Sequence, residues 1–309
     1  MTAAAFPLTR ASHGASVGDY FTLLKPRVMS LVVLTAIAGL FVAPGHLDPI
    51  SAFTAILCIA VGAGASGALN MAFDSDIDAV MTRTRTRPIP MGRIGRESAL
   101  AFGCVLAVGS VAVMGLFLNF LAAALLAFTI FFYVVVYTLL LKRRTPQNIV
   151  IGGLAGALPP AIGWAAASGM LDMRPLVLVA IIFVWTPPHF WALSLWRADD
   201  YARAGVPMLP VQKGKRATRR QMLVYALVLL PLGMAPAFIG MAGPVYLACS
   251  LALGLALYWQ CVRVLLERDE AQEPAAHRLF VVSIVYVFAL FASLIVEHVA
   301  SIHPIGRLI

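Results

Sequence analysis

The sequence predicts an all-α polytopic membrane protein with nine transmembrane helices. Of its 309 residues, 61% are hydrophobic and only 12% are charged, whereas an ordinary soluble domain has roughly 25% charged residues. Long stretches contain no Asp, Glu, Lys or Arg, and about 20 apolar residues are enough to span a bilayer as a helix. Lys and Arg instead cluster in short segments between these stretches, as in the loops of membrane proteins.

The apolar stretches give the position of each helix. Some apolar stretches have room for one span only. Longer stretches can hold two helices separated by a turn. We expect spans at 28–47, 51–73, 98–118, 120–141, 149–169, 175–196, 222–242, 244–263 and 279–299.

The basic residues predict the orientation. If the N-terminus is cytoplasmic, the cytoplasmic segments hold 21 of the 23 Lys and Arg residues, in agreement with the positive-inside rule. Nine spans place the C-terminus on the outer side of a bacterial inner membrane. The membrane orientation explains why Lys and Arg residues are in excess, with a net charge of +9. We therefore expect no binding to nucleic acid.

The chain divides into a short leading segment and a membrane domain. Residues 1–24 lack the continuous apolar core of a secretory signal, so we expect a flexible cytoplasmic N-terminal tail, followed by a membrane domain over 25–309. The four cysteines lie singly in or beside apolar stretches, and we expect them to be small core residues rather than ligands or paired bridges.

Two cytoplasmic loops share a pattern. The loop from Asp74 to Arg96 and the loop from Asp199 to Arg220 both begin with acids, continue through basic residues and contain a proline-flanked turn. They are separated by four helices, which suggests two related four-helix halves followed by a final helix. We therefore expect the two loops to meet over one central cavity.

The first loop begins with a cluster of carboxylates. At 100° per residue, Asn70, Asp74 and Asp78 fall within an arc of about 80° on one helix face, and Asp76 points elsewhere. Carboxylates at a helix C-terminus repel each other and oppose the helix dipole. A divalent cation would relieve both penalties, and hard oxygen ligands suit Mg²⁺ or Mn²⁺. We therefore expect Asn70, Asp74 and Asp78 to be metal ligands.

Three arginines follow the carboxylates at two-residue spacing. Arg83, Arg85 and Arg87 offer fork-shaped donors that match phosphate oxygens, so carboxylates and arginines together indicate a metal-bound diphosphate. The alternative is a solvated loop in which Asp and Arg pair with each other and the arginines only orient the protein.

The Asn-x-x-x-Asp-x-x-x-Asp pattern at the end of the second predicted helix resembles the first signature of the UbiA superfamily of intramembrane aromatic prenyltransferases. Other stretches resemble the heme-farnesylating branch of that superfamily. They are Lys25-Pro26-Arg27, Met81 to Pro88, Tyr137 to Arg143, Thr145 to Gly153, Pro187-Pro188-His189-Phe190 and Asp200 to Pro210. Together they run through most of the chain from residue 25 to 214.

The resemblance implies a UbiA-type helical bundle with a central cavity. It also implies transfer of the farnesyl group of farnesyl diphosphate to a vinyl group of protoheme IX (heme b), with addition of water. The second acidic motif departs from the superfamily's usual Asp-x-x-x-Asp, because Asp200 is followed four residues later by Ala204. Asp200 is therefore the acid carried over, and a second full metal site is in doubt.

Further residues are expected at the site. Besides Asn70, Asp74, Asp78 and Asp200, we expect the catalytic residues to be Arg83, Arg87, Tyr137, Lys142 and Arg143. Lys142 and Arg143 would bind the diphosphate. The additional substrate-binding candidates are Lys25, Arg27, Tyr133 and, for the heme, His189.

Two of these assignments have alternatives. The faces of Tyr133 and Tyr137, one helical turn apart, would stabilise an allylic cation, or the two are interfacial belt tyrosines. His189 would ligate the heme iron or contact a propionate, or it is a packed, hydrogen-bonded histidine.

Three other functions compete with this interpretation. A prenyltransferase for a quinone precursor is disfavoured by the stretch 145–153 and by the altered second motif. A secondary transporter would place ionisable or broken-helix sites near the bilayer midplane, where none is found. A non-catalytic assembly factor would not need so many phosphate-type residues. If the enzyme interpretation holds, heme-handling proteins or assembly proteins of a terminal oxidase are the partners to expect.

Overall fold

The computed structural model describes residues 14–268 and 271–302, and every regular element within them is a helix. Eight helical segments are long and apolar enough to cross a membrane, and a bent pair, α1 (Val17–Leu23) and α2 (Pro26–Val42), makes a ninth if it counts as one span. The eight are α3 (Pro49–Phe73), α5 (Arg96–Phe117), α6 (Phe120–Phe131) continuing into the π-helix η1 (Phe132–Leu141), α7 (Asn148–Ala157) with α8 (Pro159–Ser168), α9 (Met173–Trp196), α12 (Lys215–Phe238), α13 (Pro244–Leu265) and α14 (Pro274–Val299).

Each predicted span corresponds to one of these segments, with differences at the ends. The prediction placed the end of the first span at residue 47, but α2 ends at Val42 because Pro44 and Gly45, with φ 124°, follow it. The prediction placed the start of the seventh span at 222, but α12 begins at Lys215. Basic residues fill its first two turns, so the helix extends beyond the apolar stretch that revealed it.

The expected flexible tail is wrong for part of its length. Residues Val17–Leu23 form α1, which Ser16 and Asp19 cap reciprocally at its start. Leu23 is fully buried against the end of α3. Residues 1–13 lie outside the described residues.

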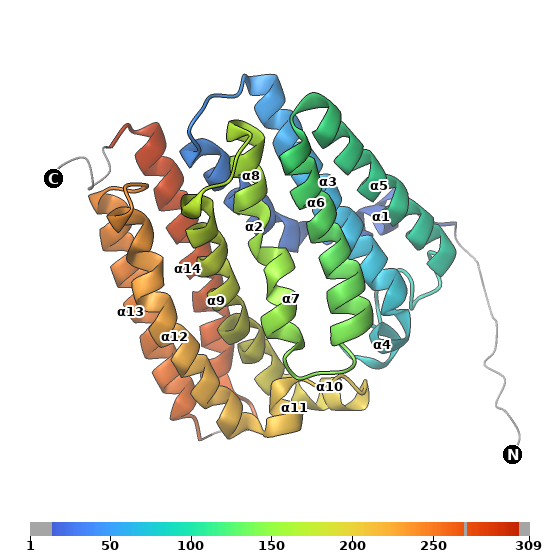
Figure 1. The fold of residues 1–309 in the computed structure, drawn as a ribbon. Helices are drawn as coiled ribbons and strands as arrows, with labels where there is room; N and C mark the ends of the chain where they lie inside the picture. The colour runs from blue at the N-terminus through green and yellow to red at the C-terminus, as the bar shows by residue number, and fades with distance from the viewer. Residues whose placement is uncertain (1–13, 269–270, 303–309) are drawn as a thin grey trace, which may run out of the picture.

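Three short helices gather at one end of the bundle, hereafter the acidic end (Figure 1). They are α4 (Ser75–Val80), α10 (Ala198–Arg203) and α11 (Leu209–Lys213). Helices α4 and α10 each contain six residues, and each follows a long helix, α3 or α9, after one intervening residue. This parallel between the two halves supports the repeat inferred from the two acidic loops.

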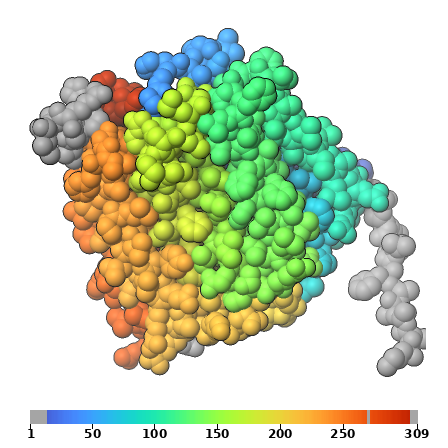
Figure 2. Space-filling view, in the orientation of Figure 1, coloured from blue at the N-terminus to red at the C-terminus, as the bar shows by residue number. Residues whose placement is uncertain are grey.

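The inner helices approach each other closely through small residues. A Cβ on Gly39 of α2 would lie 2.0 Å from the Pro160 carbonyl oxygen of α8, and one on Gly163 would lie 2.2 Å from the Ala36 oxygen. Small residues at such crossings are typical of membrane helix packing. Side chains close the gaps between ribbons on the face shown in Figure 2.

The outer helices turn large hydrophobic side chains outward, as expected of lipid-facing surfaces. Helix α5 is the least buried of the spans. Of the four cysteines, Cys58 and Cys261 are buried as expected and Cys249 is half-buried, but Cys104 is exposed on α5.

Candidate active site

The acidic motif lies where α3 passes into α4. Helical hydrogen bonding continues through the junction, because the Asp74 N–H donates to the Asn70 oxygen at 2.9 Å and the Asp78 N–H donates to the Asp74 oxygen at 2.8 Å. Asn70, Asp74 and Asp78 are 4%, 1% and 2% exposed, whereas the Asp76 side chain is 64% exposed. The predicted geometry, with three residues on one face and Asp76 on another, is confirmed.

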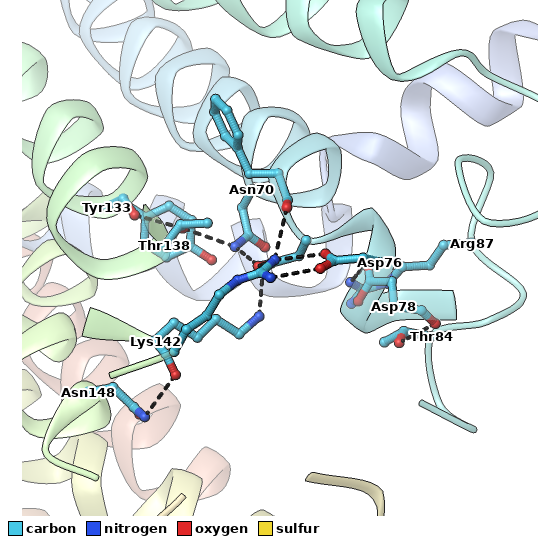
Figure 3. A network of polar contacts seen from close by, with 12 residues as sticks. Asn70, Asp76, Asp78, Thr84, Arg87, Tyr133, Thr138, Lys142 and Asn148 are labelled. Atoms are coloured by element: carbon cyan, nitrogen blue, oxygen red, sulfur yellow. Dashed lines mark hydrogen bonds and ion pairs between the residues drawn. The ribbon is translucent and has the colours of Figure 1, made fainter. Parts of the chain in front are cut away.

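Two lysines from different elements converge on this face, of which Figure 3 labels Lys142. The Asn70 amide Nδ2 donates to Asp74 Oδ2 at 2.7 Å and to Thr138 Oγ1 at 3.0 Å. Lys25, at the break between α1 and α2, donates to Asn70 Oδ1 at 2.6 Å. Lys142, at the end of η1, pairs with Asp74 Oδ2. Residues distant in sequence thus form one polar cluster.

The π-helical geometry of η1 sets the direction of its polar side chains. The Lys142 N–H donates to the Tyr137 oxygen, five residues earlier, at 2.9 Å. The Thr138 hydroxyl donates to the Tyr133 oxygen, also five residues earlier, at 2.9 Å. Such π-helical turns occur frequently at functional sites. Thr138 was not predicted as a site residue, and a threonine in an apolar stretch gave no pattern that would reveal it.

The arginine loop folds back onto Asp78. Arg87 pairs with Asp78 Oδ2 at 2.7 Å, and the Thr84 hydroxyl donates to the Asp78 carbonyl oxygen at 3.1 Å. Arg83 and Arg85 are exposed, and neither side chain has a hydrogen bond or ion pair within the described part of the chain. Burial raises the pKa of the Tyr201 hydroxyl, and the nearby positive charges of Arg83 and Arg87 oppose that rise.

Arg143 lies on the other side of the acidic motif. Its guanidinium donates two hydrogen bonds of 2.7 Å to Asp76, and it also donates to the Phe73 oxygen at 3.2 Å. The bond from Arg143 lowers the pKa of Asp76 to about 2. Arg143 is also 3.8 Å from Asp74 Oδ1, so it contributes charge to the cluster from the side, although it was expected on the diphosphate.

The second acidic loop contacts the first, as predicted. Asp200 of α10 is 4% exposed and accepts a 2.9 Å hydrogen bond from the Thr82 hydroxyl. Arg203 pairs with the same carboxylate oxygen. Burial raises the pKa of Asp200, but the Thr82 bonds and the charges of Arg203 and Arg197 outweigh it, so the net shift is downward. Apolar residues of both loops, Ile77, Met81, Tyr201, Val206 and Met208, form one buried cluster with Ile149 of α7 beside this contact.

Two buried carboxylate oxygens have no hydrogen-bond partner. Asp74 Oδ1 and Asp200 Oδ2 are both fully enclosed. Among the described residues, each has only a long ion pair, 3.8 Å from Arg143 and 3.7 Å from Arg197, and a buried oxygen without a hydrogen bond is suited to accept a cation or a donor. Within residues 14–268 and 271–302, no three His, Cys, Asp or Glu side chains converge as a ready metal site. The residues fit Mg²⁺, which usually binds one or two carboxylates and completes its shell with water and substrate phosphate.

An apolar cavity of about 120 Å³ begins beside the polar cluster. Lys25 and Tyr133 lie on its wall together with apolar residues of α2, α3 and α6 to α8, including Val32, Ile59, Leu126, Pro159 and Ile162. Because Lys25 also bonds to Asn70, one end of the cavity adjoins the acidic face. The arrangement suits a ligand with a charged head and an apolar tail.

The two predicted tyrosines lie together. The rings of Tyr133 and Tyr137 are 5.3 Å apart. A Cβ on Gly152 would lie 2.2 Å from Tyr137 Cδ2, so α7 approaches η1 at a position where only glycine fits. This contact accounts for Gly152, whereas a Cβ on Gly153 would lie 2.9 Å from Thr186 Cγ2 of α9.

His189 packs between α9 and α14. Its ring is stacked on Trp185 at 4.4 Å and on Phe280 at 4.5 Å, and its Nδ1 is 2.7 Å from the Ser283 hydroxyl. That hydroxyl donates to the Phe280 oxygen at 2.7 Å, so the proton between Nδ1 and Ser283 belongs to the histidine, and Nε2 keeps its lone pair. The packed, hydrogen-bonded alternative therefore describes the geometry.

Arg27 and Asp199 are not part of these contacts. Arg27 is exposed, and its guanidinium forms no hydrogen bond or ion pair with a described residue. Thr82 bonds to Asp200, and Thr84 bonds to the Asp78 backbone. Neither threonine was predicted as a site residue, although both lie within the stretch Met81 to Pro88.

Comparison with known proteins is consistent with this geometry. The chain is 62% identical over 290 residues to the protoheme IX farnesyltransferase of Azorhizobium caulinodans, covering 93% of this chain and 94% of the relative. It is 58% identical over 283 residues to the protoheme IX farnesyltransferase of Parvibaculum lavamentivorans, covering 91% and 89%.

Solved structures share the fold. A digeranylgeranylglyceryl phosphate synthase structure has a TM-score of 0.73 at 17% identity, covering 90% of this chain and 98% of that one. A UbiA homologue from Archaeoglobus fulgidus bound to GPP and Mg²⁺ has a TM-score of 0.67 at 16% identity, covering 90% and 99%. The model of the UbiA prenyltransferase family matches residues 32–292. This chain is an integral, multi-pass membrane protein that belongs to the UbiA prenyltransferase family.

Proposed function

We propose that this enzyme transfers the farnesyl group of farnesyl diphosphate to a vinyl group of protoheme IX, with addition of water, and releases heme O and diphosphate. The observation that carries the proposal is the buried Asn70, Asp74 and Asp78 face, flanked by Lys25 and Lys142 and open to an apolar cavity. Relatives about 60% identical to this chain bear the name protoheme IX farnesyltransferase.

The reaction begins when the bond between farnesyl C1 and the diphosphate oxygen breaks. Asn70, Asp74 and Asp78 would hold Mg²⁺ or Mn²⁺, which neutralises charge on the departing diphosphate. Lys142 and the arginines supply further positive charge at fixed positions. Electrostatic stabilisation is most effective when the charges are already in place before the reaction. Arg83 and Arg87 approach from the loop, and Arg143 from the far side of Asp74.

The allylic cation is then captured by the heme. The terminal vinyl carbon bonds to farnesyl C1, the positive charge moves to the vinyl carbon attached to the porphyrin, and a water oxygen adds there with loss of one proton. The neighbouring rings of Tyr133 and Tyr137, tilted by 33° to each other, would stabilise a nearby cation through their faces. The apolar cavity binds the farnesyl chain and keeps water away from C1 until the carbon–carbon bond has formed.

Asp200 and His189 have roles of a different kind in this proposal. Asp200 acts as a positioning residue, because it holds Thr82 and thereby the loop that carries Arg83 and Arg87. His189 keeps the lone pair of Nε2 for the heme iron, while Ser283 fixes the other nitrogen. Arg27 would contact the substrate from the entrance, next to Lys25.

We also propose how the protein is oriented in the membrane. The acidic end faces the cytoplasm of a bacterial inner membrane, because the basic loops gather there. Heme-handling proteins or assembly proteins of a terminal oxidase would then deliver the heme or accept the product.

Mass spectrometry of heme after incubation of purified protein with protoheme, farnesyl diphosphate and Mg²⁺ tests the proposal. We expect a mass gain of one farnesyl and one hydroxyl group. A parallel incubation with an aromatic quinone precursor in place of protoheme tests the alternative substrate. Prenylation of that precursor with unchanged heme would overturn the proposal.

A further inference from the structure

A second cavity, of about 360 Å³, lies on the outer side of the acidic motif. Its walls come from the end of α3, the start of α4, the start of α5 and the end of η1. The lining residues are Phe73, Ser75, Asp76, Arg96, Thr138, Leu139 and Arg143. Asn70, Lys25 and Tyr133 do not line it, so it is separate from the apolar cavity of the candidate active site.

This outer cavity opens at the membrane boundary. Helices α5 and α6 meet at the far end of the bundle, and α5 and η1 diverge toward the acidic end with the end of α3 between them (Figure 1). Leu139 is 40% exposed, and α5 is the least buried span. Exposed apolar surface on a span faces lipid, so the cavity lies between acyl chains on one side and the aqueous phase on the other.

The charge of the cavity favours a single anion. Arg143 is neutralised by its two hydrogen bonds to Asp76. Arg96 lies with its guanidinium 6.0 Å from the centre of the Phe73 ring and has no ion pair among the described residues. It is the first residue of α5, where Gly95 gives no side-chain cap, so the helix dipole adds positive potential that the exposed neighbour Glu97 offsets in part.

We propose that this outer cavity binds the headgroup of an anionic phospholipid. Arg96 and the outer edge of Arg143 would bind the phosphate, which carries one negative charge in a phosphodiester and matches the one uncompensated arginine. Phe73 and Leu139 provide apolar surface for the first carbons of an acyl chain. The inference concerns a different cavity from the proposed farnesyl transfer, although Arg143 borders both sites. The same phosphate chemistry would also allow free phosphate to bind, so the test separates the two sources.

Native mass spectrometry of the full purified chain measures the site directly. The probes are phosphatidylglycerol, phosphatidylcholine with the same acyl chains, and inorganic phosphate. We expect phosphatidylglycerol to bind at least tenfold more tightly than phosphatidylcholine, and Arg96→Gln to weaken it about tenfold. Arg144→Gln is the matched control, because Arg144 is exposed next to Arg143 and does not line the cavity.

A second variant tests the cavity without removing charge. Leu139→Trp should fill it and weaken phosphatidylglycerol binding while both arginines remain. Size-exclusion profiles and binding of farnesyl diphosphate report whether each variant is folded. Equal phosphatidylglycerol binding by the wild type, Arg96→Gln and Leu139→Trp would overturn the proposal. So would displacement of the lipid by millimolar inorganic phosphate, which would identify a free-anion site.

Discussion

At the scale of single residues, neighbouring aspartates differ sharply in environment. Asp74 and Asp78 are buried at the polar cluster, and one oxygen of Asp74 accepts no hydrogen bond from a described residue. Asp76 lies two residues from each but is exposed and paired with Arg143. Helical periodicity predicted this separation. It could not predict Thr138, since its contact with Asn70 depends on the π-helical turn of η1.

The three aspartates should therefore respond differently to the same substitution. Asp74→Asn or Asp78→Asn should lower turnover by at least about 100-fold, because each removes a charge that would hold the metal and diphosphate. Asp76→Asn should cost less than about fivefold, because an exposed ion pair contributes little. Heme farnesylation by purified variants measures this. Equal losses in all three would contradict the single-face account, and failure of all three to fold would indicate a structural role.

Substitution of His189 tests whether this histidine binds heme. If Nε2 binds the heme iron, His189→Ala should alter the visible spectrum of the heme-bound protein and weaken heme affinity about tenfold. Ser283→Ala should cause a smaller change, because it frees the ring without removing Nε2. Farnesyl diphosphate binding is the control and should be unchanged. If the visible spectrum and the heme affinity of His189→Ala are unaltered, His189 is a packing residue and does not bind heme.

At the scale of elements, the apolar stretches predicted the spans well because each span is defined by its own composition. The short helices α4, α10 and α11 and the capped helix α1 were missed, because each is too short to form an apolar stretch and is held by tertiary contacts. Helix α10, for example, contacts the first loop through Asp200 and Thr82. The meeting of the two loops was predicted from their shared pattern, but the residues that make the contact were not.

The contact between the loops predicts coupled effects. If Asp200 works through Thr82, then Asp200→Asn and Thr82→Val should each lower turnover about tenfold, and the double variant should be no worse than either. Asp199→Asn, at the exposed neighbouring position, is the matched control. Turnover and its Mg²⁺ dependence measure the coupling. Additive losses, or a raised Mg²⁺ requirement in Asp200→Asn alone, would make Asp200 a metal ligand instead.

At the scale of the whole molecule, the basic loops and the acidic motifs lie at one end of the bundle. The proposed orientation, with this end in the cytoplasm, rests on this distribution of charge. In a variant without the four native cysteines, Ser301→Cys should react with an impermeant maleimide in intact cells. Thr86→Cys, in the arginine loop, should react only after permeabilisation. Both positions are exposed, and the reverse labelling pattern would contradict the orientation.

We propose that Asn70, Asp74 and Asp78 hold a divalent cation that binds the diphosphate. Equilibrium binding of farnesyl thiodiphosphate, which resists ionisation, tests it without turnover. We predict tight binding with Mg²⁺ or Mn²⁺, at least tenfold weaker binding in excess chelator, and equally weak binding to Asp74→Asn with or without the metal. Undiminished binding in excess chelator, or metal-dependent binding that survives in Asp74→Asn and Asp78→Asn, would contradict the account.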